Sequence, residues 1–179
     1  MKNCPLTHND LVNIVRSATD DVFITMLGIT PERQVAYQDT TANLSTDGVV
    51  SLIGFAGLWV GTGSISCSVE LACKLASILM MAEYDSVKDE VLDAAAEVTN
   101  MIIGNVKTSL EEHLGPMGLS IPTVIHGRNF TSRTVGTQDW TIVPCLLDGD
   151  LLEVQLCLAS NEAGGRPRFA LAGQTAVQI

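Results

Sequence analysis

A long amphipathic segment, residues 86–114, constrains the fold of this sequence more than any other feature. Apolar side chains recur in it every three to four residues, and Gly115-Pro116 follows as a strong stop signal, so the pattern predicts one long helix. From residue 89 onward the apolar side chains share one side of that helix: Val91, Ala95, Val98, Ile102, Val106 and Ser109, flanked by Leu92, Thr99, Ile103 and Leu110. Such a stripe has to be buried against a second layer of structure.

Short apolar runs on both sides of this segment predict a sheet as that second layer. The predicted strands are 34–38, 49–56, 58–67, 121–126, 140–147 and 151–159. Asp47-Gly48 and Asp148-Gly149 are turn signals, the latter typical of a hairpin. Residues 128–137 are polar and are predicted to form a loop.

Two further segments have helical spacing, residues 9–27 and 68–81. Thr7 or Asn9 can cap the first, and Ser68 the second. Helix-plus-strands units therefore occur twice, at 9–67 and 89–160, which suggests an internal duplication. The predicted fold class is α+β, in two layers, with long helices on one face of a largely antiparallel sheet.

Length and composition limit the classes of function. With 179 residues, the chain is expected to form a single domain, 1–179, with its core at 7–160 and a weakly patterned tail at 161–179. The formal net charge of −10 argues against nucleic acid as a partner, because phosphate contacts need clustered Lys and Arg. Residues 49–60, the most apolar stretch, are too short to span a membrane.

The five cysteines and the N-terminal segment bear on the cellular compartment. The cysteines form no C-x-x-C pair and fit neither a disulfide framework nor a zinc site, so they are predicted to be small core side chains. The first ten residues lack the apolar run of a signal peptide. A cytoplasmic protein is therefore expected.

The side of the long helix opposite its apolar stripe carries a distinctive polar face. Six residues fall there within roughly 80° of one another: Asp93, Glu97, Asn100, Gly104, Lys107 and Glu111. An ordinary solvated face is one interpretation. Asn100 and Gly104 argue against it, because Asn competes for backbone hydrogen bonds and Gly costs about 1 kcal/mol relative to Ala inside a helix. A surface that another backbone approaches closely benefits from both residues.

The segment from Glu97 to Asn105, EVTNMIIGN, resembles the E-x-x-N-M-(I)-x-G signature of the CheC/CheX/FliY phosphatases. The neighbouring segments agree with it: Asp93-Ala94-Ala95-Ala96, VFITMLG at 22–28, and the strand sequences at 142–144 and 156–158. CheC-like members of the family carry the motif on two helices and CheX-like members on one. Because the first helix offers only Asp10-Leu11-Val12-Asn13, the sequence is similar to the CheX type, with pseudo-duplicated CheC-like units.

The resemblance implies an aspartyl-phosphate phosphatase that acts on a CheY-type response regulator. Asn100 would orient the attacking water and Glu97 would meet a cation of the regulator, while Asp93, Met101, Gly104 and Lys107 would contact it. Mg²⁺ is expected on the regulator's carboxylates, so neither a metal site nor a cofactor is expected in this chain. The resemblance also implies a homodimer, and neither nucleic acid nor a membrane is an expected partner.

Two other functions stay open at this point. The chain could be a non-catalytic adaptor that binds or sequesters a response regulator, or an unrelated α+β domain that binds a small molecule.

The remaining motifs are weaker. Gly61-Thr62-Gly63 is interpreted as a turn or bulge rather than a phosphate-binding loop. The histidines, at 8, 113 and 126, show no ligand spacing and are expected at the surface. The arginines at 128, 133, 166 and 168 are expected to be solvated in loop or tail, and Asp93, Glu97 and Glu111 to form an acidic rim around Asn100.

Overall fold

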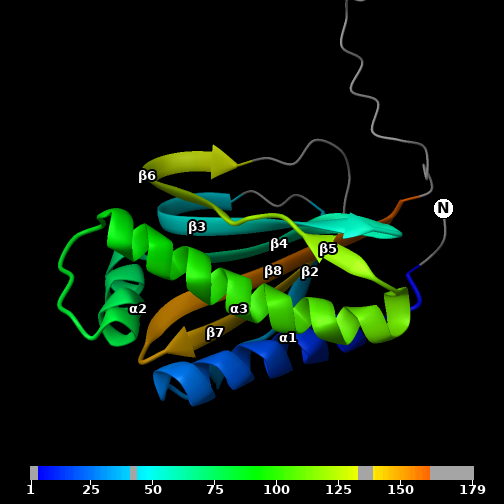
Figure 1. Cartoon of the computed structure of the whole chain (residues 1–179), viewed down its shortest axis with the longest axis horizontal. Coiled ribbons are helices and arrows are strands. Elements are labelled where there is room, and N and C mark those ends of the chain that lie inside the picture. Colours follow the sequence, from blue (N-terminus) through cyan, green and yellow to red (C-terminus); the bar gives the residue numbers. More distant parts are fainter. Residues whose placement is uncertain (1–3, 41–43, 133–138, 162–179) are drawn as a thin grey trace, which may run out of the picture.

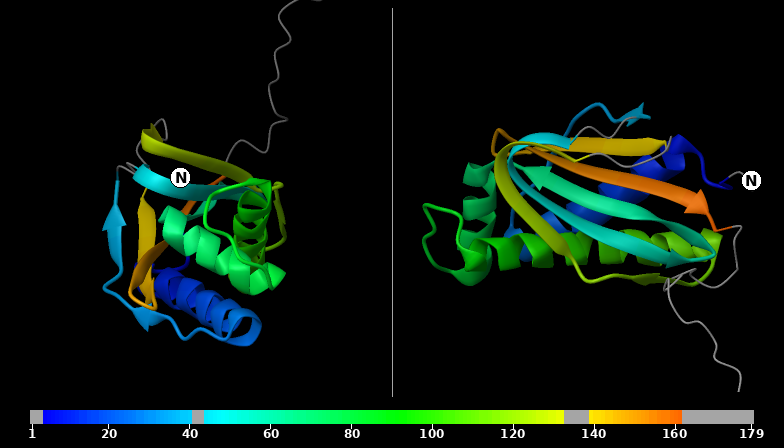
Figure 2. Two further views of the ribbon diagram at one scale, coloured as in Figure 1. Left: turned by 90° about the vertical axis from the view of Figure 1, so that its left-hand side faces the viewer. Right: turned by 90° about the horizontal axis from the view of Figure 1, so that it is seen from above.

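The computed structural model describes residues 4–40, 44–132 and 139–161. Within these residues, an antiparallel sheet of eight strands forms one layer, and the helices pack on one of its faces (Figure 1). Seen from the side, the sheet is twisted and curves around the helices (Figure 2). The predicted two-layer α+β class is confirmed.

The order of the strands in the sheet reveals how the two halves of the chain combine. The strands are β1 (Glu32–Arg33), β2 (Tyr37–Asp39), β3 (Leu44–Gly57), β4 (Trp59–Cys67), β5 (Met117–Leu119), β6 (Thr123–Ser132), β7 (Trp140–Leu147) and β8 (Asp150–Ser160). β4 and β8 are neighbours at the centre, with β3 beside β4 and β7 beside β8. β1 and β2 pair with β7 of the second half, whereas β5 and β6 pair with β3 of the first. Each half therefore contributes edge strands that pair with the other half.

The helices begin and end close to the predicted positions. They are α1 (His8–Val22), the π-helical turn η1 (Phe23–Leu27), α2 (Val69–Met80) and α3 (Asp89–Leu114). Thr7 caps α1 in a capping box with Asp10, and the Ser68 side chain caps α2. The first helix ends at Leu27 as predicted, but its last turn widens to π geometry before Gly28 closes it in the left-handed conformation.

The predicted strand 34–38 is wrong as a single element. β1 and β2 both pair with β7, but three residues between them, 34–36, face only Val143 and Pro144. Pro144 has no N–H to donate to a neighbouring strand, so the ladder is interrupted there. Only the Gln34 N–H reaches across, donating to the Pro144 carbonyl at 3.2 Å.

The predicted polar loop 128–137 is also wrong in its first part. β6 continues to Ser132 because β3 begins at Leu44 and gives it a partner along its length. β6 is an edge strand, and its end from residue 128 onward is polar. The alternation of apolar residues that would predict a strand is therefore missing there. β5 was not predicted at all, since three residues are too few for a periodic signal. Residues 133–137 and the predicted tail beyond 161 lie outside the described residues.

Close contact between α3 and the sheet sets the orientation of the long helix. A Cβ at Gly63 would come within 2.7 Å of the Ile103 Cδ1, so the missing side chain lets α3 approach β4. The interpretation of Gly61-Thr62-Gly63 as a turn or bulge is therefore wrong, because the three residues lie in continuous pairing with β8. On α3, Val91, Val98, Ile102 and Val106 are buried as predicted, while Ala95 and Ser109 are half-buried.

The cysteines behave as core side chains, as predicted. Cys67, Cys73, Cys145 and Cys157 are buried and Cys4 is half-buried. Burial raises the pKa of the Cys67 and Cys145 thiols to about 12. These thiols therefore stay protonated at neutral pH. None of the described helices is long and apolar enough to cross a membrane.

Candidate functional site

The polar face of α3 points away from the sheet. Asp93, Glu97 and Asn100 are exposed, and Gly104 and Lys107 are half-buried further along the same face. The structure thus brings together the polar residues that the sequence selects. Their exposure also argues against an unrelated domain in which both faces of this helix are packed.

Met101 lies differently from the other candidates. It is half-buried and its side chain packs against the edge of the hydrophobic core. Most of its side chain is therefore turned toward the core of the chain and away from solvent.

Gly104 has no structural reason to be glycine within the chain. Apart from its own helical backbone, a Cβ at this position would meet no atom of the described residues within 4 Å, and the residue continues a regular α-helix without a positive φ. Glycine in a helix interior costs about 1 kcal/mol relative to alanine. Packing against the described residues therefore does not require glycine here.

Lys107 and Glu111, further along this face, interact with each other and with the backbone of the chain. The Lys107 Nζ lies 2.8 Å from the Glu111 Oε2, and the Glu111 Oε1 accepts a hydrogen bond from the Met117 N–H at 2.8 Å. The hydrogen bond from Lys107, and then that from the backbone, lower the pKa of the Glu111 carboxyl. The predicted acidic rim is therefore wrong at Glu111, which fixes Lys107 and the start of β5 instead.

We expect this link to make stability depend on pH at the acid end. Because the folded-state pKa of Glu111 is lowered from 4.5, its contribution is present above that value and is lost as pH falls through the folded pKa. The Thr7 hydrogen bonds lower the pKa of Asp10 from 3.8 in the same direction. Thermal melting from neutral pH to about pH 3 should show a smaller loss of stability in Glu111→Gln than in the wild type. Equal losses in the two proteins would contradict this role of Glu111.

The exposed face of α3 presents hydrogen-bonding groups one helical turn apart. Asn100 offers a carbonyl oxygen that accepts and an amide that donates, and Glu97 offers a carboxylate one turn earlier. Among the described residues, no group of three or more His, Cys, Asp or Glu side chains is placed to hold a metal ion.

Other predicted surface residues are separate from this face. His113 and His126 are exposed, and Arg128 is an exposed residue of β6. His8 contacts Thr141 near the start of α1, with 3.3 Å between its Nδ1 and the Thr141 Oγ1. The arginines at 133, 166 and 168 lie outside the described residues.

Comparison with known proteins agrees with the fold and with the motif. The family model described as chemotaxis phosphatase CheX matches residues 49–146. The chain is 30% identical over 129 residues to the CheY-P phosphatase CheX of Thermotoga maritima, covering 70% of this chain and 81% of that protein.

Solved structures give the same result. A putative chemotaxis protein of Desulfovibrio vulgaris Hildenborough superposes with a TM-score of 0.74 at 26% identity, over 88% of this chain and 100% of that one. A CheX–CheY–BeF3–Mg²⁺ complex from Borrelia burgdorferi matches with a TM-score of 0.67 at 29% identity, over 84% of this chain and 99% of that one. The matches first define the class, an α+β protein of the CheC-like fold. Within that class, the chain belongs to the CheX family of chemotaxis phosphatases.

Proposed function

We propose that this protein hydrolyses the phospho-aspartate of a CheY-type response regulator, with the exposed face of α3 as its contribution to the reaction site. The observation that carries the proposal is one stripe of α3 formed by Glu97, Asn100 and Gly104. The space beside Gly104 is open, and packing against the described residues does not require a glycine there. Family membership and the CheX–CheY complex of a relative support the choice of partner.

The chemistry fits what an exposed helix can do. Water attacks the phosphorus of the acyl phosphate in line with the departing carboxylate, so that the P–O bond to the aspartate breaks and inorganic phosphate leaves. Such a reaction depends mainly on positioning and on stabilisation of charge. The Asn100 carboxamide accepts a hydrogen bond from the water and orients it, while Mg²⁺ stays on the carboxylates of the regulator.

Glu97 is proposed to set the register of the complex. One turn before Asn100, its exposed carboxylate would pair with a cation of the regulator, most directly its active-site Lys. Glu97→Ala should then weaken binding of the activated regulator about tenfold, measured by titration calorimetry. Glu70→Gln, at an exposed carboxylate on α2, serves as the control and should bind normally. Unchanged affinity of Glu97→Ala would remove this role.

Turnover separates a phosphatase from a sequestering adaptor. Substoichiometric amounts of the protein should release phosphate from an excess of phosphorylated regulator until the regulator is exhausted. A requirement for one protein per regulator would identify an adaptor and contradict the proposal. The homodimer stays a prediction, for which light scattering should give twice the 19.1 kDa of one chain.

A further inference from the structure

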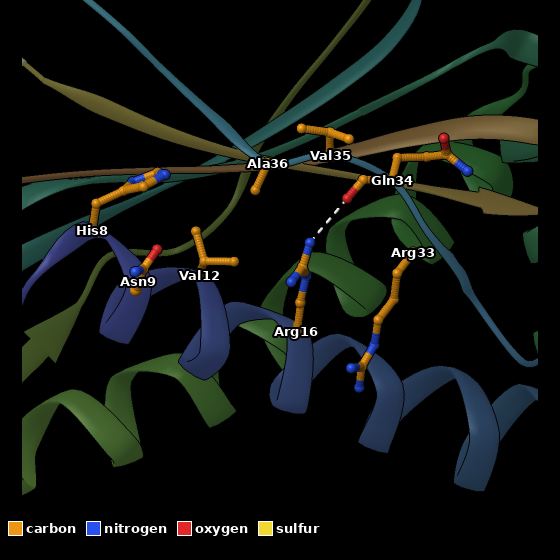
Figure 3. A pocket seen from close by; sticks show the side chains of 8 residues that line it. All are labelled: His8, Asn9, Val12, Arg16, Arg33, Gln34, Val35 and Ala36. Atoms are coloured by element: carbon orange, nitrogen blue, oxygen red, sulfur yellow. Dashed lines mark hydrogen bonds between the residues drawn. The ribbon is translucent and has the colours of Figure 1, made fainter.

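A cationic groove lies between the first half of α1 and the segment that joins β1 to β2 (Figure 3). Its volume is about 440 Å³, within the range of small-molecule sites. His8, Asn9, Val12 and Arg16 line it from α1, and residues 33–36 line it from the other side. A smaller hollow that shares Arg16 and Arg33 continues it toward Asp20 and Pro144. None of the lining residues belongs to α3.

The charge of Arg16 is uncompensated in this groove. Within the part of the chain that the structure describes, its guanidinium donates one hydrogen bond, from Nη2 to the Gln34 carbonyl at 2.9 Å, and its buried Nε has no acceptor. Among the described residues it forms no ion pair, whereas Lys74, Lys107 and Arg33 each do. In a chain of net charge −10, an unpaired and half-buried arginine on a groove is a local positive centre.

The neighbouring groups include a paired carboxylate and several polar atoms. Asp20 lines the adjoining hollow, and its carboxylate pairs with Arg33 at 2.6 Å. In Figure 3 the Arg16 side chain extends across the groove toward Gln34, with Val12 and Ala36 to one side. Beyond them, the His8 ring and the Asn9 amide supply polar atoms at the far end.

We propose that this groove binds a small organic anion whose oxyanion group, a carboxylate or a phosphate, pairs with Arg16. The planar guanidinium fork suits both groups, and the bound anion compensates the charge of the half-buried arginine. The body of the ligand lies along Val12 and Ala36, and its far end reaches the polar atoms of His8 and Asn9. The site is independent of the proposed activity at α3.

Titrations of the full chain followed by amide NMR test the site, with sodium succinate and sodium phosphate as separate probes at constant ionic strength. Saturable shifts are expected in the first two turns of α1 and at residues 34–36. The probe that binds with the higher affinity identifies the preferred oxyanion as a carboxylate or a phosphate. Arg16→Gln, which keeps an amide to donate to Gln34, should weaken binding about tenfold. Arg128→Gln, at an exposed arginine on β6, should leave binding unchanged.

Several results would overturn the proposal. The first is the absence of saturable amide shifts at the groove with either probe, and the second is shifts spread evenly over the surface. The third is equal affinity of the probe for Arg16→Gln and for the wild type. If Arg16→Gln does not fold, the map of the wild-type chain decides alone.

Discussion

Replacement of Asn100 by alanine is expected to abolish stimulated dephosphorylation of the regulator while the protein stays folded. The side chain is exposed, so its removal leaves no cavity and no buried group without a partner. If the carboxamide orients the attacking water, its loss should lower the rate of phosphate release by about 100-fold or more. The measurement is phosphate release from the phosphorylated regulator at saturating concentrations of each variant.

Asn105 offers a matched control for this experiment. It is an exposed asparagine on the same helix, about 140° around the axis from Asn100. Asn105→Ala should therefore retain full activity. Normal phosphate release by Asn100→Ala, or an equal loss in both variants, would refute the role assigned to Asn100.

Replacement of Gly104 should change stability and binding in opposite directions. Gly104→Ala should stabilise the protein by up to about 1 kcal/mol, because a Cβ there meets only open space and alanine favours the helix. The same Cβ occupies the space that the regulator needs, so binding should weaken, and Gly104→Gln should weaken it further. Chemical denaturation measures the first effect, and titration of the activated regulator measures the second.

The test is informative because stability should rise while binding of the regulator weakens. A merely solvated face predicts higher stability with unchanged binding for both Gly104 variants. Asn105→Ala again serves as the control, because it should also favour the helix and should not affect binding. Tight binding by Gly104→Gln would show that no backbone approaches this turn.

The long helix and the identity of its two faces could be predicted because one periodic pattern over many turns determines both. The short strands could not, because their limits depend on partners distant in sequence. Pro144 interrupts a ladder formed by residues 32–39, and Leu44 extends β6 to Ser132. The periodicity of one segment does not determine which distant strand pairs with it.

The candidate site was predictable to a similar degree. Asp93, Glu97, Asn100 and Gly104 follow from helical geometry, and the structure places them on one exposed face. That Glu111 is held by Met117 depends on how the chain turns after Gly115, which no local pattern determines. The Arg16 groove was missed for the same reason, because β1 returns to α1 only through its pairing with β7.

The exchange of edge strands between the two halves has a consequence for how the protein loses its structure. Because β2 is held by β7 and β6 by β3, unravelling one half removes the neighbours on which the other half depends. We infer that the domain opens as one cooperative unit, without a partly folded species that retains α3 alone. A fragment carrying only residues 89–160 would lack α1, α2, β3 and β4, the elements against which most of the apolar stripe of α3 packs.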